Sequence, residues 1–566
     1  MSEEKKQYPP VFPDIEDWPI HKLSEDRRNF VKEIDEFMLR RFLKQSPTEL
    51  TDLIAKTIFL ERIRIKEEAW KVDPPNERQF WRRIGKKLVR NSLDRNDQEA
   101  GANNEEILRQ IVNRYSEEIV GTFRTGTFLF ARRFLTFFFT RLLNTAAGKN
   151  MARFWGSRYR LQDRFIVRGE IETVRSLMTK GTVVVVPTHF SNLDSILIGY
   201  ALDAFAGLPS FSYGAGLNLY NTGYTAYFMN RLGAYRVDRR KKNPIYLETL
   251  KTMSNLSIQR GVNSLFFPGG TRARSGMPED KLKLGLLGSV VEAQRAMCQR
   301  SNTGKVFVVP LVLSYHFVLE AEFLIEQHLR QVGKERYMGR DASHSPWRIF
   351  QFVWKFFAEG NDVTISIGQP MDVLGNPVDA QGNSYDQYGN HLDIAAYFKT
   401  KGEVKEDLQR ESEYTKILGE HIVERYRKDN IVLTSHLVAF AAFEMLKYQN
   451  PRLDLYGLLR LPADDYVFPK EPLHEVVTQL REALLQMEKQ GDIKLSEQMY
   501  WEIDKLIEDG MSHLGNYHLT EPLYENKKGQ IVSDNFKLLY FYHNRLENYG
   551  LHRKIKWKQL ELQEME

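Results

Sequence analysis

The sequence TVVVVPTHFSNLDSILIGYAL, residues 182–202, decides the fold of the region around it. Its valines end at Pro187 and predict a buried strand, and the apolar residues that follow predict a helix beginning near Ser191. His189 lies in the short connection between them, at the carboxyl end of the strand, where open α/β sheets usually place their ligands. The stretch therefore predicts an α/β sheet with a histidine at its ligand-binding edge.

Other short apolar runs, bounded by glycine or proline, predict further strands of this sheet. They are FIVRG at 165–169, SLFFP at 264–268, VFVVPLVL at 306–313 and VTISIG at 363–368. Because this strand pattern begins near residue 164 and ends before 400, we expect an α/β domain at 164–400, a β-sheet flanked by helices. The patterns at 1–163 and 401–566 are helical, so we expect a helical N-terminal region and a helical C-terminal region.

Local signals place individual elements in these regions. SPTE at 46–49 combines an N-cap serine, a proline at the first helical position and a glutamate three residues after the cap, so a long helix should follow. Residues 417–446 have a helical pattern, and 434–446 within them predict a buried helix.

Residues 374–390 carry repeated turn signals. Their acids lack EF-hand spacing, so we expect a loop or hairpin there rather than a calcium site.

The composition indicates a folded chain with little cysteine chemistry. The 566 residues are 42% hydrophobic, enough for a large core in two or three domains. A single cysteine, Cys298, excludes an internal disulfide and an all-cysteine zinc site, and it suits a reducing compartment. The first residues, MSEEKKQYPP, have charges and prolines where a signal peptide needs an apolar core. We therefore expect no signal peptide and a cytoplasmic location.

Residues 121–164 are strongly basic and rich in phenylalanine. Nine arginines and lysines accompany one acid, Asp163. Four of the arginines, Arg124, Arg132, Arg133 and Arg141, interrupt the apolar stretch 121–147, so it lacks the uninterrupted run that a membrane-spanning helix needs. This mixture is typical of a helix on an anionic membrane surface, and its phenylalanines favour membrane over nucleic acid. The alternative is a core helix whose arginines extend to solvent. A second aromatic stretch, 346–360, is better explained as a core helix over the sheet.

His189 and Asp194, within HFSNLD, could act as a base and its orienting partner. A carboxylate at one ring nitrogen fixes the tautomer and stabilises the imidazolium, while the other nitrogen takes a proton from a hydroxyl. A structural alternative exists because Ser191 and Asp194 also have the spacing of a capping box.

The sequence FFPGGTRARSG, residues 266–276, could hold an anion. Its glycines permit close approach of the backbone, and Arg272 and Arg274 could grip a phosphate through paired hydrogen bonds. These arginines lie near His189 if the strands that precede the two motifs are neighbours. The alternative is a basic turn in solvent.

The segment LGAYRVDRRKKN, residues 232–243, lies between these two motifs in the chain. It predicts a short strand followed by a cluster of basic residues. Arg239 is the residue of this cluster that we expect to bind phosphate, and the others suit a solvated charged turn.

Taken in order, these motifs resemble the blocks of the glycerophospholipid acyltransferase superfamily. HFSNLD resembles the HxxxxD block, GAYRVDR the second block and FPGGTRARSG the FPEGTRSRSG block. VVPLVLSYHFVLEAE at 308–322, with Tyr315 and Glu320, resembles the fourth block. The spacing in this block, and the segment at 417–446, are more similar to glycerol-3-phosphate and dihydroxyacetone-phosphate acyltransferases than to the short lysophosphatidate enzymes. The resemblance covers about residues 164–450.

The resemblance implies a fatty acyl transfer to the primary hydroxyl of glycerol 3-phosphate, the first step of phospholipid synthesis. The acyl donor is acyl-CoA or acyl carrier protein, and no metal or other cofactor is implied. The enzyme is expected on the cytoplasmic face of the membrane as a peripheral protein. The matching residues are His189 as general base, Asp194 as its partner, and a phosphate-binding group of Arg239, Gly270, Arg272 and Arg274. Gly269 stands where the family usually has glutamate, and Ala273 stands where it usually has serine. The missing carboxylate at position 269 bears on how the acceptor is bound.

Two alternatives remain open at the level of sequence. A lysophosphatidate or dihydroxyacetone-phosphate acyltransferase would share the catalytic residues, and a noncatalytic lipid-binding scaffold would need none of them. A serine hydrolase is disfavoured because no GxSxG is present, and P-loop nucleotide binding because no GxxxxGK[ST] is present. The sequence does not define the oligomeric state.

Overall fold

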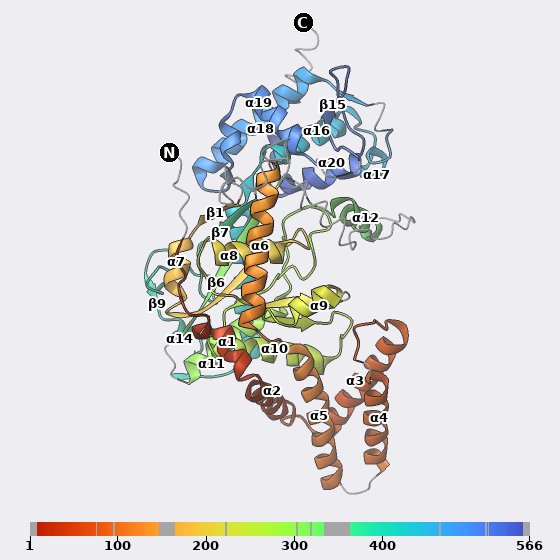
Figure 1. Ribbon diagram of the computed structural model, residues 1–566, viewed down its shortest axis with the longest axis vertical. Coiled ribbons are helices and arrows are strands. Elements are labelled where there is room, and N and C mark those ends of the chain that lie inside the picture. The colour runs from red at the N-terminus through yellow and green to blue at the C-terminus, as the bar shows by residue number, and fades with distance from the viewer. Residues whose placement is uncertain are drawn as a thin grey trace.

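A seven-stranded mixed sheet forms the centre of the molecule (Figure 1). The computed structural model describes residues 8–557 except 75, 94–96, 147–164, 221–222, 301–303, 317, 319, 333–362, 463–465, 516–517 and 519. The sheet has the order β1-β7-β6-β2-β5-β3-β4. Its strands are β1 (Phe165–Gly169), β2 (Gly181–Pro187), β3 (Ser212–Gly216), β4 (Ala234–Val237), β5 (Ser264–Leu265), β6 (Lys305–Ser314) and β7 (Val363–Ile367).

Five neighbouring strands, β6, β2, β5, β3 and β4, run in one direction, whereas β7 is antiparallel to β6 and β1 is parallel to β7. β2 and β5 pair directly, with Val184 opposite Ser264, which meets the condition for the arginines to lie near His189. Because the five strands are parallel, their carboxyl ends meet at one edge of the sheet. The loops that follow β2, β4, β5 and β6 at this edge carry the motifs singled out in the sequence.

The valines of β2 show why this strand is central. Val183 and Val185 pack into the core on one face of the sheet, and Val184 and Val186 pack into the core on the other. A strand covered on both faces is a continuous apolar run, as the sequence indicated. The helices between the strands are α7 (Ile171–Leu177), α8 (Asp194–Ala204), α9 (Gly223–Met229), α10 (Pro244–Gln259), α11 (Leu284–Gln299) and α12 (Ala321–Val332).

The N-terminal region is helical, as predicted. It comprises α1 (Pro19–Glu25), α2 (Arg27–Phe42), α3 (Pro47–Glu67), α4 (Glu77–Leu93), α5 (Asp97–Ile119) and α6 (Thr125–Ala146). The expected capping box starts α3, since Ser46 and Glu49 exchange hydrogen bonds. Helices α3, α4 and α5 project from the sheet at the end opposite to the C-terminal helices, and α6 runs along the sheet between the two ends (Figure 1).

The C-terminal region packs against the sheet through a shared hydrophobic core. Its main helices are α15 (Leu408–Asp429), α16 (Thr434–Gln449), α18 (Lys470–Gln490), α19 (Ile503–His513) and α20 (Phe536–His543). The buried helix predicted at 434–446 is α16. The helical pattern at 417–446 is not continuous, because Asn430 is extended and Ile431–Val432 form β12, which pairs with β14 (Lys494–Leu495). One core cluster joins α16, α18, α19 and α20 to β2, β6 and β7.

Smaller elements complete the chain. The turn-rich segment after β7 contains the hairpin of β8 (Ser384–Tyr385) and β9 (His391–Leu392), as expected for residues 374–390. The aromatic stretch 346–360 lies outside the described residues. In the part of the chain that the structure describes, no helix combines the length and apolarity needed to cross a membrane. The other short elements are α14 (Ile394–Tyr397), β10 (Lys399–Thr400), β11 (Glu403–Val404), α17 (Leu455–Leu458), β13 (Val467–Phe468), β15 (Tyr524–Glu525) and β16 (Ile531–Val532).

Gly276→Ala is expected to destabilise the protein more than Gly261→Ala. Both glycines have positive φ, 86° and 80°, so alanine costs each position about 1–2 kcal/mol. At position 276 the added Cβ would also overlap the backbone carbonyl oxygen of Phe541, whereas nothing lies within 4 Å at position 261. Thermal unfolding should give a lower midpoint for Gly276→Ala. Equal midpoints would contradict the packing of α20 against this loop.

Candidate active site

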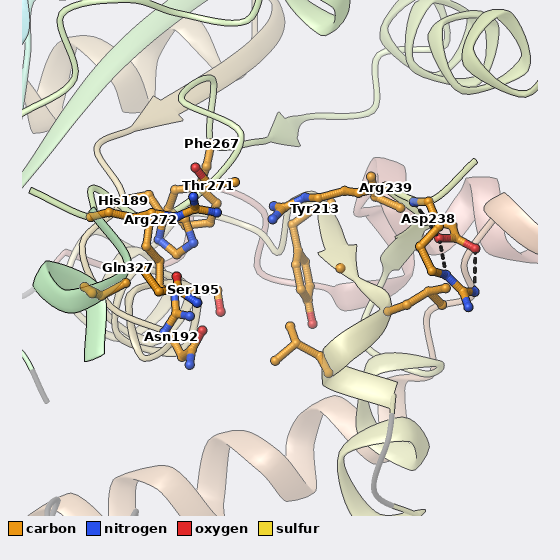
Figure 2. Close-up of a pocket in the computed structure, with 18 of the residues that line it drawn as sticks. His189, Asn192, Ser195, Tyr213, Asp238, Arg239, Phe267, Thr271, Arg272 and Gln327 are labelled. Atoms are coloured by element: carbon orange, nitrogen blue, oxygen red, sulfur yellow. Dashed lines mark hydrogen bonds and ion pairs between the residues drawn. The ribbon is translucent and has the colours of Figure 1, made fainter. Parts of the chain in front are cut away.

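A pocket of about 250 Å³ opens at the carboxyl edge of the sheet (Figure 2). The loop after β2 contributes His189 and the loop after β4 contributes Arg239. The loop after β5 contributes Arg272 and Arg274, and Trp70 reaches the pocket from the N-terminal region. The remaining lining residues are Asn192, Ser195, Tyr213, Gly214, Gly216, Leu217, Leu219, Val237, Asp238, Arg240, Phe267, Thr271, Leu324 and Gln327. Parallel strand ends therefore bring together groups that are far apart in the sequence.

His189 and Asp194 form a hydrogen-bonded pair. The Nδ1 atom of His189 lies 2.9 Å from Oδ2 of Asp194, whose side chain is fully buried, while the His189 side chain keeps 15% of its surface exposed at the pocket. An ionised carboxylate can only accept, so Nδ1 carries the shared proton. The other ring nitrogen, Nε2, is then left with a lone pair that can accept a proton.

The Asp194 carboxylate is held by further donors besides the imidazole. Its Oδ2 accepts the backbone N–H groups of Phe190 and Ser191, at 2.7 and 2.9 Å, and its Oδ1 accepts the hydroxyl of Tyr315 at 2.8 Å. Burial, with the Asp194 charge beside it, raises the pKa of Tyr315 well above its usual range, so this phenol is a donor. These donors fix the carboxylate that orients His189.

The capping box suggested for Ser191 and Asp194 is only half formed: Asp194 accepts the backbone N–H of Ser191, but the Ser191 hydroxyl does not cap α8. Helix α8 begins at Asp194, three residues later than predicted, and no side chain caps it. The Ser191 hydroxyl instead donates to Oε2 of Glu320 at 2.9 Å, and the Asn192 N–H donates to Oε1 of Glu320 at 3.0 Å. The turn before α8 is thus tied to the loop that follows β6.

The loop after β5 makes three contacts with His189. The backbone N–H of Ala273 donates to the carbonyl oxygen of His189 at 2.7 Å, and the backbone N–H of His189 donates to Oε1 of Glu279 at 2.9 Å. The ring of Phe267 stacks on the imidazole with centroids 4.1 Å apart. The imidazole and its peptide groups are therefore set by this loop.

Three arginines converge on the same pocket. Arg272 donates to Glu320 at 3.2 Å, but within the described residues neither Arg239 nor Arg274 forms an ion pair. Figure 2 shows the Arg239 side chain reaching across the pocket toward the side that holds His189 and Arg272. Loss of solvation and the charges of Arg272 and Arg274 lower the pKa of Arg239. Such a concentration of uncompensated positive charge suits an anion such as phosphate.

The glycines of the second motif, Gly269 and Gly270, are not among the residues that line this pocket. Gly270 has φ of 75°, so its position requires glycine, but its N–H donates to the carbonyl of Phe267 and it does not line the pocket. Gly269 is packed closely: a Cβ there would lie 2.8 Å from Cγ of Glu279. Of the phosphate group expected from the sequence, the structure brings together the three arginines and leaves Gly270 outside.

Two of the other basic residues after β4, Arg240 and Lys241, pair with the N-terminal region, whereas Lys242 is exposed as expected for a solvated turn. Arg240 pairs with Asp238 and with Asp73, and its guanidinium lies 4.6 Å from the ring centre of Trp70. Lys241 is buried and pairs with Glu118 of α5. Asp73 and Glu118 are far away in the sequence, which explains why the sequence suggested only a charged turn.

Arg545 is a residue of the site that the sequence did not reveal. It follows α20, is only 2% exposed, and its guanidinium carbon lies 3.7 Å from the ring centre of Phe190. It interacts electrostatically with Asp194 and Glu279, and burial lowers its pKa. No motif marks it, because its importance depends on the packing of the C-terminal region behind His189.

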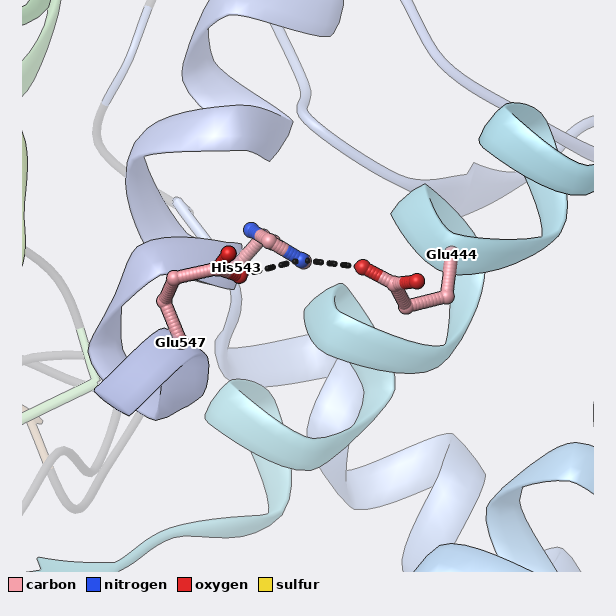
Figure 3. Close-up of side chains that lie close together, drawn as sticks. All are labelled: Glu444, His543 and Glu547. Atoms are coloured by element: carbon pink, nitrogen blue, oxygen red, sulfur yellow. Dashed lines mark hydrogen bonds and ion pairs between the residues drawn. The ribbon is translucent and has the colours of Figure 1, made fainter. Parts of the chain in front are cut away.

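Glu444, His543 and Glu547 are the group of described residues closest to a metal-binding arrangement (Figure 3). Both carboxylates converge on Nε2 of His543, at 2.9 and 3.4 Å, and Lys447 pairs with Glu444 at 2.7 Å. The Lys447 ammonium thus compensates Glu444, and His543 lies between the two carboxylates. The cluster joins α16 to the segment that carries Arg545.

Comparison with known proteins gives a match to a family model and a similar solved structure. Residues 166–314 match the protein-family model described as Acyltransferase. A similar solved structure is the 1-acyl-sn-glycerophosphate (LPA) acyltransferase PlsC from Thermotoga maritima, with 15% sequence identity and a TM-score of 0.24. That similarity covers 67% of this chain and 97% of the other. The family match includes most of β1 and all of β2 to β6, and with them His189, Asp194 and the three arginines.

Glu279→Gln is expected to change how stability depends on pH. Burial raises the pKa of Glu279 from 4.5 to about 7, so between these values the folded protein binds a proton that the unfolded chain has lost. The free energy of unfolding of the wild type should therefore fall through this window as pH rises, by about 3 kcal/mol in total. The variant cannot ionise at this position and lacks this loss.

Urea unfolding of both proteins at about pH 5 and about pH 8 measures the effect. The stability of Glu279→Gln relative to the wild type should increase at the higher pH. Asp280→Asn, at an exposed neighbouring carboxylate, is the control and should show no such change. A relative stability of Glu279→Gln that is the same at both pH values would contradict the shifted pKa.

Proposed function

We propose that this protein, which contains an acyltransferase domain at residues 166–314, transfers a fatty acyl group from a thioester to the primary hydroxyl of glycerol 3-phosphate. One observation carries the proposal: a histidine–aspartate pair and three arginines share a single pocket. The pair supplies a base for a hydroxyl, and the arginines supply a site for a phosphate. A small molecule that has both groups fits this arrangement.

His189 acts as the general base. Its Nε2 accepts the proton of the acceptor hydroxyl while the oxygen attacks the thioester carbonyl. The C–O bond forms, the C–S bond breaks, and the imidazolium returns the proton to the leaving thiolate. Asp194 stabilises the imidazolium through Nδ1, so the cycle needs no covalent acyl-enzyme. Much of the rate comes from holding the two reactants together.

The arginines select the acceptor. Arg239, Arg272 and Arg274 hold its phosphate, and Glu320 orients Arg272 by a hydrogen bond. The pocket of about 250 Å³ suits a compact acceptor such as glycerol 3-phosphate. Lysophosphatidate and dihydroxyacetone phosphate carry the same two groups and are the competing acceptors. The donor is acyl-CoA or acyl carrier protein.

His189→Ala is expected to lower kcat by about 100-fold to 10,000-fold, because general base catalysis typically supplies that factor. His391→Ala, at an exposed histidine of β9, is the matched control and should keep wild-type activity. The assay offers a labelled acyl thioester with glycerol 3-phosphate, dihydroxyacetone phosphate or lysophosphatidate in turn, and identifies the product. Full activity of His189→Ala would contradict the mechanism, and transfer to none of the acceptors would favour a noncatalytic scaffold.

We also propose that α6 attaches the protein to an anionic membrane surface. One face of α6 packs on the protein, where Phe139 is buried and Arg132 pairs with Asp203. The other face exposes Phe130, Phe134 and Phe137, which are 58%, 52% and 57% exposed. Exposed phenylalanines beside the exposed Arg133 fit an interfacial helix. The basic residues at 147–164 lie outside the described residues.

Replacing Phe130, Phe134 and Phe137 together by serine is expected to weaken binding to anionic phospholipid vesicles by at least about tenfold, since burial of even one phenylalanine contributes about 1.5–3 kcal/mol. Vesicle co-sedimentation at low salt measures the affinity. Tyr388→Ser, at a residue that is 80% exposed in the β8–β9 hairpin, should bind like the wild type. Equal binding by the triple variant would exclude this face of α6.

A further inference from the structure

We propose that Glu279 is a positioning residue for the base, holding the backbone of His189 with a carboxylate that enters the space beside Gly269. The proposal deepens the proposed function, because it concerns how the same base is oriented. Glu279 lies thirteen positions after Phe266, where the second motif begins, and no motif singled it out.

The first step of the argument is the space that Glu279 fills. A Cβ on Gly269 would lie 2.8 Å from Cγ and 2.9 Å from Oε1 of Glu279, so the two side chains cannot coexist without movement. The backbone at 269 does not have positive φ, unlike Gly270, and so would accept a larger residue. Glycine is therefore required at 269 by the Glu279 side chain and not by the backbone conformation. The related motif has its carboxylate at 269, and this chain brings one from 279.

The second step is what the carboxylate binds. Its Oε1 accepts the backbone N–H of His189 at 2.9 Å, while the carbonyl of the same residue accepts the N–H of Ala273 at 2.7 Å. Both polar groups of His189 in the main chain are thus fixed by one loop. Because these groups set the direction of Cα–Cβ, they determine whether Nδ1 meets Asp194.

The third step is how the charge is tolerated. Oε2 of Glu279 is buried and has no hydrogen-bond partner among the described residues. Nε and Nη1 of Arg545 are also buried and also lack a hydrogen-bond partner among these residues. Glu279 and Arg545 nevertheless attract each other electrostatically. Arg545 thereby offsets the charge of Asp194, and that of Glu279 when it is ionised, above its pKa of about 7. Asn544 fastens this segment to the loop by donating to the carbonyl of Ser275 at 2.8 Å.

Glu279→Ala is expected to lower kcat by about tenfold to 100-fold, as small misplacements of a catalytic group do, with little change in KM for either substrate. The decisive variant is Gly269→Glu combined with Glu279→Ala. It removes the obstructing side chain and offers a carboxylate from the other side of the same space. This double variant should recover most of the kcat lost in Glu279→Ala.

Matched variants separate positioning from stability. Gly269→Leu with Glu279→Ala fills the space without an acceptor and should stay as slow as Glu279→Ala. Asp280→Ala removes an exposed neighbouring carboxylate and should match the wild type. Amide hydrogen exchange of His189 is the second readout: it should be faster in Glu279→Ala and slow again in the Gly269→Glu double variant.

Two results would overturn the proposal. One is wild-type kcat together with wild-type exchange at His189 in Glu279→Ala. The other is a Gly269→Glu double variant that is no faster than Glu279→Ala in catalysis and no slower in exchange. A wild-type protein without acyl transfer would instead count against the proposed function, and the exchange measurement would still decide the role of Glu279.

Discussion

The buried carboxylate of Asp194 is the constraint on which the site depends. A fully buried charge is costly unless donors surround it, and Asp194 receives the imidazole, two backbone N–H groups and the hydroxyl of Tyr315. Three of these donors come from the tight turn after β2, and the fourth, Tyr315, directly follows β6. The hydrogen bonds to Asp194 therefore fix the positions of His189, of the turn after β2 and of Tyr315 at the end of β6.

The pocket combines this constraint with a separation of charge. Asp194 and Glu279 lie on one side of the imidazole, and Arg545 of the C-terminal region interacts electrostatically with both. Arg239, Arg272 and Arg274 lie on the pocket side, where a phosphate would bind. Glu320 bridges the two sides, because it accepts from Ser191 behind and from Arg272 in front. A substrate that is anionic at one end and neutral at its hydroxyl would align with this arrangement.

The sequence predicted the parts of this arrangement that are local. The strand run of β2 and the capping box of α3 were accessible from apolar patterns and caps, whereas the pairing of β2 with β5 was only the condition for bringing the arginines near His189. The sequence pattern placed the start of α8 near Ser191, but the helix begins at Asp194, whose side chain binds the turn before it. The pattern also joined α15 to α16, because nothing in it reveals that Ile431 pairs with Lys494. Glu279 and Arg545 could not be predicted, since their roles arise from contacts between distant segments.

The central claim is that Asp194 holds His189 as the tautomer whose Nε2 faces the acceptor. Nitrogen–proton correlation spectra of isotope-labelled protein, with the His189 signal assigned by comparison with His189→Gln, test this most directly. The account predicts that neutral His189 carries its proton on Nδ1, in a strong hydrogen bond to Asp194, and has an unprotonated Nε2. A neutral ring protonated on Nε2 would contradict it, because such a ring has no lone pair to offer the substrate hydroxyl.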